Sequence, residues 1–216
     1  MKAKILIIGG VFTVFVLVLS LGIDFLFPPP NPELRTFNFS MHGDLVFDDA
    51  FRGTNPDSPL VYAYFVDFTC PVCAQKHPDF LQLLEEHPEV NFLIKHTVDY
   101  RSEESVFASV AFECLRAQGQ KWDLKNYLFS EPFTREQIID YVQFLGIDYE
   151  QFLHCTEDET TERIIEADTL HASYLGVRGT PTVFLNGIRI EGYHTFDVYS
   201  QMIQREWNEL QGASTG

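Results

Sequence analysis

A long apolar run leads directly into two cysteines in the stretch Leu60-Val-Tyr-Ala-Tyr-Phe-Val-Asp-Phe-Thr-Cys70-Pro-Val-Cys73. Residues 60–68 are almost all apolar and β-favouring, which is typical of a central strand that is covered on both faces. The turn-rich segment 55–59 precedes this run, and the apolar spacing becomes helical after Cys70. The stretch therefore predicts a buried strand, followed by a helix that begins at the cysteines.

A second strand is expected after this helix. The apolar residues of the helix fall on one side: Phe80, Leu81 and Leu84. Pro78 is expected to interrupt the helix and Pro88 to end it, because proline lacks a backbone donor. Residues 90–98 return to a β-favouring pattern. A strand, a short helical crossover and a second strand predict a parallel pair with a right-handed connection.

The rest of the chain predicts a helical block, a hairpin and a last helix. Residues 102–176 keep a helical period, which indicates four or five short helices. Strand-like residues 182–185 and 188–191 flank Asn-Gly at 186–187, a pair that supplies the positive φ angles of a tight turn. Residues 196–210 have an amphipathic helical pattern. The predicted class is α/β, with a helical insertion between the strands.

Composition and charge restrict the class of function. The chain has 216 residues, with 31 acidic and 15 basic side chains and a formal net charge of −16. This length fits one domain that carries an insertion. The negative charge repels phosphate backbones and no basic cluster in the sequence offsets it, so we exclude nucleic-acid binding.

The N-terminus predicts a membrane anchor. Lys2 and Lys4 precede residues 5–27, of which the first nineteen carry no charge. Nineteen helical residues reach roughly 28 Å, which is close to the ~30 Å hydrocarbon core of a bilayer. The two lysines place the N-terminus in the cytoplasm and the remainder on the other side. The alternative is a signal peptide that is cleaved after the small residues at 20–22.

We therefore expect five segments along the chain. They are a cytoplasmic N-terminus at 1–4, a transmembrane anchor or uncleaved signal at 5–27, a linker at 28–39, a domain at 40–211 and a tail at 212–216. The linker begins with three prolines, which make a stiff spacer.

The two cysteines of Cys70-Pro-Val-Cys73 are suited to redox chemistry. Residues three apart at a helix start lie on one face, where they can close a small disulfide ring. Pro71 suits the first helical turn, where its missing N–H costs little. Cys70 faces unpaired N–H groups and the positive end of the helix dipole, which favour its thiolate. We interpret Cys70 as the exposed, attacked sulfur and Cys73 as the buried, resolving sulfur.

Two other interpretations of these cysteines remain open. Cys70, Cys73 and His77 have a spacing that can bind zinc, although a structural zinc site needs a fourth ligand, which no second motif supplies. The cysteine pair could also form a structural disulfide, but so small a ring constrains the unfolded chain very little.

A second motif, Leu175-Gly-Val-Arg-Gly-Thr-Pro-Thr-Val-Phe-Leu-Asn-Gly187, joins the helical block to the hairpin. Together with Cys-Pro-Val-Cys after an apolar strand, it resembles the DsbA-like branch of the thioredoxin superfamily over about residues 40–210. The resemblance implies a thioredoxin-like fold with an inserted helical subdomain at about 102–176. It also implies that Pro181 is cis beside the cysteine pair and that the backbone of Thr180 pairs with an extended substrate segment.

Three positions bear on how far the resemblance extends. Members of the family often carry a buried acid six residues before the first cysteine, where this chain has Tyr64. Asp67 lies three residues before Cys70, so Asp67 or water is assigned to proton transfer at Cys73. Val72 stands where strongly oxidising members have a histidine that stabilises the thiolate. We therefore expect the pKa of Cys70 within the roughly 3.5–7.5 range of such sites, above its low end.

Cys114 and Cys155 lie in the helical block. The resemblance implies a structural disulfide between them, since similar cysteines form a bridge within the insertion of some DsbA-like proteins. A location outside the cytoplasm favours the bridge, and the alternative is two buried free thiols that act as small apolar residues. Closing about forty residues would contribute roughly 3–5 kcal/mol in the chain-entropy model.

The sequence thus predicts a thiol–disulfide oxidoreductase that is anchored in the cell membrane by a single span, with its catalytic domain on the periplasmic or extracellular side. The expected role is an oxidase that introduces disulfides into exported proteins with free or paired cysteines.

The expected partners follow from this role. No dissociable cofactor is needed, and by family analogy a DsbB-like or vitamin-K-epoxide-reductase-like membrane protein removes the electrons. A monomer is expected, because fewer than thirty residues between span and core leave little room for a dimerisation segment. The alternatives are a disulfide isomerase or reductase with the same site, and an exported metal-binding module that uses Cys70, Cys73 and His77.

Overall fold

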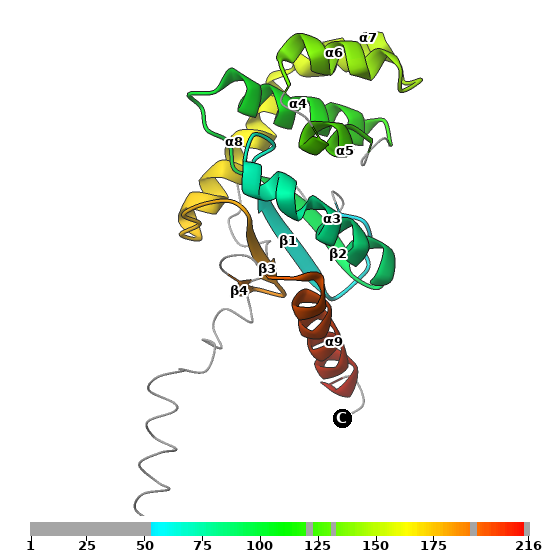
Figure 1. Cartoon of the computed structure of the whole chain (residues 1–216), viewed down its shortest axis with the longest axis vertical. Coiled ribbons are helices and arrows are strands. Elements are labelled where there is room, and N and C mark those ends of the chain that lie inside the picture. Colours follow the sequence, from blue (N-terminus) through cyan, green and yellow to red (C-terminus); the bar gives the residue numbers. More distant parts are fainter. Residues whose placement is uncertain (1–52, 120–122, 131–132, 191–193, 214–216) are drawn as a thin grey trace, which may run out of the picture. The chain divides into compact units, whose positions relative to one another are not determined.

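A four-stranded mixed sheet lies at the centre of the part of the chain that the computed structural model describes, residues 53–119, 123–130, 133–190 and 194–213 (Figure 1). The strands are β1 (Val61–Val66), β2 (Asn91–His96), β3 (Thr182–Leu185) and β4 (Ile188–Ile190). Their order across the sheet is β2-β1-β3-β4, so the strand that leads into the cysteines is an inner one.

Strand pairing follows the pattern that the sequence predicts. β1 and β2 are parallel, with Val61 opposite Asn91, as the β-α-β order requires. β3 runs antiparallel to both β1 and β4. In the turn between β3 and β4, Asn186 and Gly187 have φ angles of 50° and 84°, the positive values that a primed hairpin turn needs. The parallel pair and the hairpin are confirmed.

Helices surround the sheet and form the insertion. In the described ranges they are α3 (Pro71–Glu86), α4 (Glu103–Ala117), α5 (Asp123–Ser130), α6 (Arg135–Gln143), α7 (Tyr149–Thr156), α8 (Glu159–Tyr174) and α9 (Phe196–Ala213). The segment from α4 to α8 separates β2 from β3, which confirms the expected helical insertion between the strands.

Local capping determines where the helices of the insertion begin. The side chains that accept a backbone N–H from the first turn of α4, α6, α7 and α8 belong to Ser102, Thr134, Asp148 and Asp158. These bonds satisfy donors that every helix start leaves unpaired, so the breaks between the helices are encoded by nearby residues.

β1 is buried on both faces, as its apolar sequence predicts. On one face, Tyr62 and Tyr64 pack against Phe80 of α3, and Tyr62 also contacts Tyr199 of α9. On the other face, Phe65 belongs to a second apolar cluster that includes Ala172, near the end of α8. The helix that carries the cysteines therefore packs on a rigid, aromatic surface.

α3 continues through Pro78, which corrects the expectation that this proline interrupts the helix. The buried residues of α3 are Cys73, His77, Phe80 and Leu83. Leu81, which the sequence placed on the buried side, is only half-buried. A proline removes one hydrogen bond from a helix. Burial of His77 and Phe80 on either side of Pro78 stabilises the helix across that missing bond.

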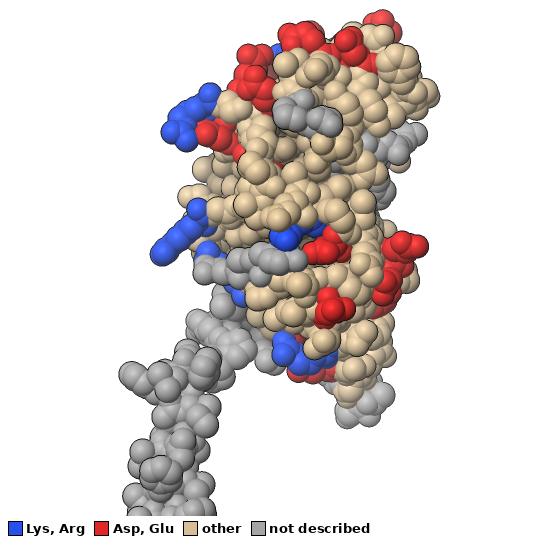
Figure 2. Space-filling view, viewed as in Figure 1, with Lys and Arg blue, Asp and Glu red and all other residues tan. Residues whose placement is uncertain are grey.

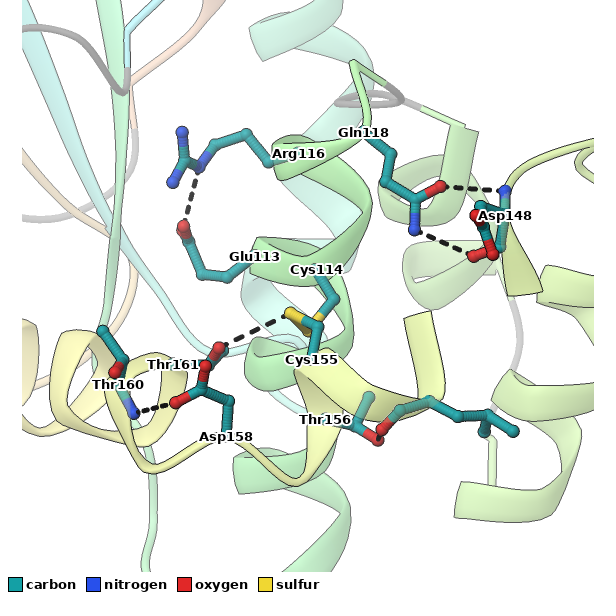
Figure 3. The surroundings of a disulfide bond; sticks show 11 residues. Glu113, Cys114, Arg116, Gln118, Asp148, Cys155, Thr156, Asp158, Thr160 and Thr161 are labelled. Carbon is teal, nitrogen blue, oxygen red and sulfur yellow. Dashed lines mark hydrogen bonds and ion pairs between the residues drawn. A yellow bond between two sulfur atoms is a disulfide. The ribbon is translucent and has the colours of Figure 1, made fainter. Parts of the chain in front are cut away.

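A disulfide joins Cys114 of α4 to Cys155 of α7, which confirms the expected bridge (Figure 3). Cys114 is fully buried, and the hydroxyl of Thr161 lies 3.5 Å from the sulfur of Cys155. Close by, the side-chain amide of Gln118 donates to the backbone carbonyl of Asp148 and accepts from its N–H. The covalent bond and the amide contacts together fasten α7 to α4.

Buried charged groups connect β2 to the helical insertion. Lys95 forms an ion pair with Asp168 of α8, although both side chains are almost fully buried. The Nε2 atom of His96 lies 2.9 Å from Oε1 of Glu113 in α4, and the backbone N–H of His96 donates to Asp168. β2 is thus held by α4 on one side of the insertion and by α8 on the other.

The expected N-terminal segments, 1–4, 5–27 and 28–39, lie outside the described residues, as does the expected start of the domain at 40. Among the helices that the structure does describe, none is both long enough and apolar enough to cross a bilayer. The last helix, α9, ends at Ala213, two residues beyond the expected end of the domain at 211.

Candidate active site

The start of α3 holds the cysteine pair just beyond the carboxyl end of β1. Cys70 is the N-cap residue of α3 and has an extended backbone, with φ −79° and ψ 118°. Pro71 follows it in the first turn, where the helix needs no N–H. Both sulfurs are free, and Cys70 is half-buried whereas Cys73 is 0% exposed. One sulfur is therefore accessible to a second protein and the other is enclosed.

A loop from a distant part of the chain lies against Cys70. The sulfur of Cys70 lies 3.4 Å from the carbonyl oxygen of Thr180 and donates a hydrogen bond to it when Cys70 is protonated, although the two residues are 110 positions apart. The peptide bond between Thr180 and Pro181 is cis. Thr182, at the start of β3, pairs with Phe65 of β1. The register of the sheet thus brings the two sequence motifs into one site.

Hydrogen bonds favour the thiolate of Cys70. The Cys73 thiol donates to the Cys70 sulfur, and the Thr180 side chain and the backbone N–H groups of Cys73 and Val72 also stabilise the negative charge. Partial burial of Cys70 raises its pKa, but the hydrogen bonds lower the pKa by more. The pKa of Cys70 falls from 9.0 to about 5, so that about 99% of this residue is thiolate at pH 7.

Cys73 is held in the opposite state, as a thiol. Its hydrogen bond to Cys70, its burial and the neighbouring negative charge raise its pKa far above the ordinary value. When Cys73 leaves a disulfide it must therefore gain a proton, and when it attacks one it must first lose a proton. The pair combines an acidic, accessible sulfur with a basic, enclosed one.

Asp67 connects the turn before Cys70 to the helical insertion. Its Oδ1 atom accepts from the N–H and the hydroxyl of Thr69, at 2.8 and 2.7 Å. Its Oδ2 atom accepts from the hydroxyl of Ser105 in α4 at 3.0 Å, and its carbonyl accepts from the N–H of Cys70 at 3.1 Å. These bonds fix the turn that presents Cys70. A role for Asp67 in proton transfer at Cys73 stays a prediction.

The helical insertion also packs directly behind the cysteine motif. The ring of Phe68 contacts those of Phe112 in α4 and Phe129 in α5, with centroids 5.3 and 5.2 Å apart. Sequence reasoning did not connect Ser105, Phe112 or Phe129 with the cysteines. Ser102 is a typical N-cap residue and so marks a helix start, but it carries no information about the partner of the Ser105 side chain.

The side chain of His77 contacts the helical insertion. Its Nε2 atom lies 2.7 Å from Oδ1 of Asn126, and its ring contacts Phe129 with centroids 4.9 Å apart. Across the residues that the structure describes, no three or more Cys, His, Asp or Glu side chains are placed to hold a metal ion. The zinc interpretation of Cys70, Cys73 and His77 therefore gains no geometric support.

The surface of the helical insertion is acidic, whereas Cys70 has an uncharged neighbour. Figure 2 shows carboxylates gathered over the insertion. Exposed acidic residues on α6, α7 and α8 include Glu136, Asp140, Glu150, Glu159 and Glu162. Beside Cys70, Val72 is uncharged and 44% exposed. The surface next to the accessible sulfur therefore includes an exposed apolar side chain.

Comparison with protein families and curated proteins agrees with this geometry. The family model described as "Thioredoxin" matches residues 48–205. Over 160 residues the chain is 26% identical to the Na(+)/H(+) antiporter NhaA 3 of Salinispora tropica, a match that covers 72% of this chain and 24% of the antiporter. It is also 26% identical to a putative protein-disulfide oxidoreductase of Rickettsia bellii, covering 76% of this chain and 66% of that protein. The chain thus spans about a quarter of the length of the antiporters.

Solved structures share the fold. The thiol-disulfide exchange protein α-DsbA2 of Wolbachia pipientis superposes with a TM-score of 0.69 at 21% identity, covering 81% of this chain and 96% of that one. A thioredoxin-like oxidoreductase of Silicibacter pomeroyi gives 0.66 at 21% identity, with 77% and 98% covered. Oxidised BdbD of Bacillus subtilis gives 0.59 at 22% identity, with 69% and 88% covered.

Proposed function

This chain belongs to the thioredoxin family, and from that premise we propose that it is a DsbA-like thiol–disulfide oxidoreductase that introduces disulfides into exported proteins. The observation that carries the proposal is the contrast between its two free sulfurs. Cys70 is accessible and has a pKa of about 5, whereas Cys73 is enclosed and its pKa is raised. An acidic thiol is a good leaving group, so a disulfide on Cys70 is readily passed to another thiol.

Oxidation of a client takes two exchanges. A client thiolate attacks the Cys70 sulfur of the oxidised pair, and the Cys70–Cys73 bond breaks with its electrons on Cys73. Cys73 then takes up a proton, because its pKa lies above the surrounding pH. A second client thiolate attacks the client sulfur of the mixed disulfide and releases Cys70 as a thiolate. The client gains one disulfide, and the two electrons remain on the reduced pair.

The Thr180–Pro181 loop would hold the client during these exchanges. An extended client segment can form main-chain hydrogen bonds with Thr180, and such bonds do not depend on the client's side chains. The Thr180 carbonyl already lies 3.4 Å from the Cys70 sulfur, so a client strand paired at this residue brings its own cysteine close to Cys70.

We place this activity outside the cytoplasm, on a single membrane span at residues 5–27. The support is the uncharged run after Lys2 and Lys4 in the sequence. Support of another kind comes from the relatives named as Na(+)/H(+) antiporters, since a domain of this kind occurs within longer proteins of that name. A DsbB-like or vitamin-K-epoxide-reductase-like membrane protein would accept the electrons from the reduced pair, and the anchored enzyme would act as a monomer without a cofactor.

The same site could also run in the reverse direction, as a reductase or an isomerase. The redox state of Cys70 and Cys73 in the native cell separates these roles, because an oxidase is held oxidised and a reductase or isomerase is held reduced. Acid-trapped cells, alkylated and resolved by mass, should show the pair mainly as a disulfide. A mainly reduced pair would reject the oxidase role.

Reduced, unfolded ribonuclease A provides a direct test of the chemistry. The oxidised full chain should transfer one disulfide per enzyme molecule, measured as lost ribonuclease thiols and gained enzyme thiols. Cys70→Ala and Cys73→Ala should each abolish the transfer, because neither variant can form the Cys70–Cys73 disulfide. A matched control, Cys114→Ala with Cys155→Ala, should keep the transfer, because that bridge lies within the insertion. A Cys70→Ala variant as active as the unmodified enzyme would reject the proposal.

A further inference from the structure

A buried serine of the helical insertion bonds to the turn that presents Cys70. Ser105 lies in the first turn of α4 and is 0% exposed. Its hydroxyl donates to the Oδ2 atom of Asp67 across 3.0 Å, although 38 positions separate the two residues. Asp67 is itself 8% exposed. A buried carboxylate depends on the donors around it, because water cannot readily replace a hydrogen bond that is lost there.

The direction of the Ser105 hydroxyl is determined by its second partner. The backbone N–H of Asp99, in the loop between β2 and α4, donates to the Ser105 hydroxyl oxygen across 3.1 Å. The single proton of that hydroxyl is therefore directed to Asp67. The two bonds form a chain that leads from the β2–α4 loop, through α4, to the cysteine turn, and hydrogen bonds in such a chain strengthen one another.

Asp67 in turn contacts both ends of the cysteine motif. Its Oδ1 atom accepts from the N–H and the hydroxyl of Thr69. Its carbonyl accepts from the N–H of Cys70 across 3.1 Å, and its own N–H bonds to the sulfur of Cys73. Within the described residues, Ser105 is the donor to the Asp67 carboxylate that comes from another element. Ser105 therefore determines where this carboxylate lies relative to the insertion.

We propose that Ser105 is a positioning residue for thiol–disulfide exchange, which acts through Asp67 to hold the Cys70 sulfur among the groups that stabilise its thiolate. The inference rests on the proposed function, because it concerns the reactivity of Cys70 in that exchange. The backbone N–H groups of Val72 and Cys73 bond to the Cys70 sulfur while the turn keeps its place at the start of α3. A displaced turn weakens these bonds, and the Cys70 thiolate is then a poorer leaving group.

Packing alone is a different explanation of how α4 holds this turn. The ring of Phe112 in α4 packs on that of Phe68, which follows Asp67 in the chain, with centroids 5.3 Å apart. Ser105→Ala removes one hydroxyl and leaves both rings in place. An effect of this variant on Cys70 therefore belongs to the hydrogen bond and not to the aromatic contact.

The test measures Cys70 in the reduced full chain, with the Cys114–Cys155 disulfide intact. The acid dissociation constant of Cys70 is obtained from the pH midpoint of its alkylation by iodoacetamide. In Ser105→Ala this constant should fall by about two- to tenfold, which is the range that one hydrogen bond contributes. The equilibrium constant for reduction of the cysteine pair by glutathione should fall as well, because a less stable Cys70 thiolate makes the pair a weaker oxidant.

Ser109→Ala is the matched control. Ser109 is also 0% exposed, lies one turn further along α4 and donates its hydroxyl proton to the carbonyl of Ser105 across 3.1 Å. The control removes the same group from the same helix without removing a donor to Asp67. The midpoint of Cys70 and the glutathione equilibrium should both stay unchanged.

Two further variants, Ser105→Thr and Ser105→Val, repeat the test at nearly equal side-chain volume. Both enlarge the buried side chain, but threonine keeps the hydroxyl and valine lacks it. The alkylation midpoint of Cys70 should therefore be lower in Ser105→Thr than in Ser105→Val. Equal midpoints in these two variants would contradict the proposal.

Asp67→Ala removes the group through which Ser105 is proposed to act. In the Asp67→Ala background, Ser105→Ala should change the midpoint of Cys70 no further. Two residues that acted independently would instead have additive effects.

The possible failures of the two proposals are distinguishable. An unchanged midpoint in Ser105→Ala, an equal shift in Ser109→Ala, or additive effects in the double variant would each overturn the role of Ser105 and leave the proposed function intact. An unmodified enzyme whose cysteine pair does not exchange its disulfide with glutathione would overturn the proposed function, and the role of Ser105 with it.

Discussion

The alkylation of Cys70 by iodoacetamide should have a pH midpoint near 5, because hydrogen bonds from Cys73, Thr180 and two backbone N–H groups lower its pKa from 9.0 to about 5. The thiolate is the reacting species. At pH 5 about half of Cys70 is thiolate, against about one part in 10,000 of a thiol with a pKa of 9. The gain in thiolate is therefore about 5,000-fold at pH 5 and about 100-fold at pH 7.

Lower basicity offsets part of this gain. With a Brønsted coefficient of 0.4–0.5, a difference of about four pKa units weakens the thiolate as a nucleophile by about 40- to 100-fold. Cys70 should therefore react at pH 7 about as fast as a thiol with a pKa of 9, yet at pH 5 about 50- to 125-fold faster. The position of the midpoint, not the rate at neutral pH, identifies the site.

The assay uses the reduced full chain, short pulses of iodoacetamide between pH 4 and 9, and mass measurement of the peptide that contains Cys70. The Cys114–Cys155 disulfide must stay intact throughout. In Cys73→Ala the midpoint should rise, since the Cys73 thiol is the largest contributor to the low pKa. A midpoint above about pH 7.5 in the unmodified enzyme would refute the hydrogen-bond account, and so would an unshifted midpoint in Cys73→Ala.

Three further outcomes concern stability. The pKa of Cys70 is lower in the folded enzyme than in the unfolded chain, so its thiolate should stabilise the reduced enzyme. This stabilisation should be complete above about pH 9 and should decrease as the pH falls to about 5. It is measured as the difference in Tm between the reduced and oxidised forms. Replacing Cys114 and Cys155 together by alanine should lower the free energy of unfolding by about 4 kcal/mol in urea, from the loop-closure term for a separation of 41 positions. Lys95→Met should lower the free energy of unfolding by about 3–5 kcal/mol, because it leaves Asp168 buried without its ion-pair partner. Adding Asp168→Leu should recover much of that loss, and a double variant less stable than Lys95→Met would contradict this account.

Local signals explain why much of the fold could be predicted. The apolar run before Cys70 predicts an inner strand, and the Asn-Gly pair at 186–187 predicts the hairpin, because each depends on residues that are adjacent in sequence. The same logic failed at Pro78. Proline weakens a helix locally, but the burial of neighbouring residues of α3 against the sheet outweighs one missing bond.

The site could be predicted only in part, because its electrostatics depend on contacts between distant residues. The sequence indicated the order of the two sulfurs, since a helix start favours one thiolate over the other. It gave no indication that Ser105 bonds Asp67, or that Tyr64 faces a cavity beside Pro181. Such contacts leave no periodic pattern, and they appear only when the sheet register aligns β1 with β3.

The insertion therefore does more than enlarge the protein. Ser105 of α4 donates a hydrogen bond to the carboxylate of Asp67, which fixes the turn before Cys70. In the same turn, the ring of Phe68 packs on Phe112 of α4. The Thr180 loop approaches the same sulfur from the opposite end of the insertion, after α8. Because α4 and α8 are both fastened to β2 by buried charged groups, a displacement of either helix would alter the position of Cys70 relative to Thr180. The low pKa of Cys70 depends on donors within hydrogen-bond distance, so we expect the packing of the insertion, together with the Cys-Pro-Val-Cys motif, to influence the reactivity of the cysteine pair.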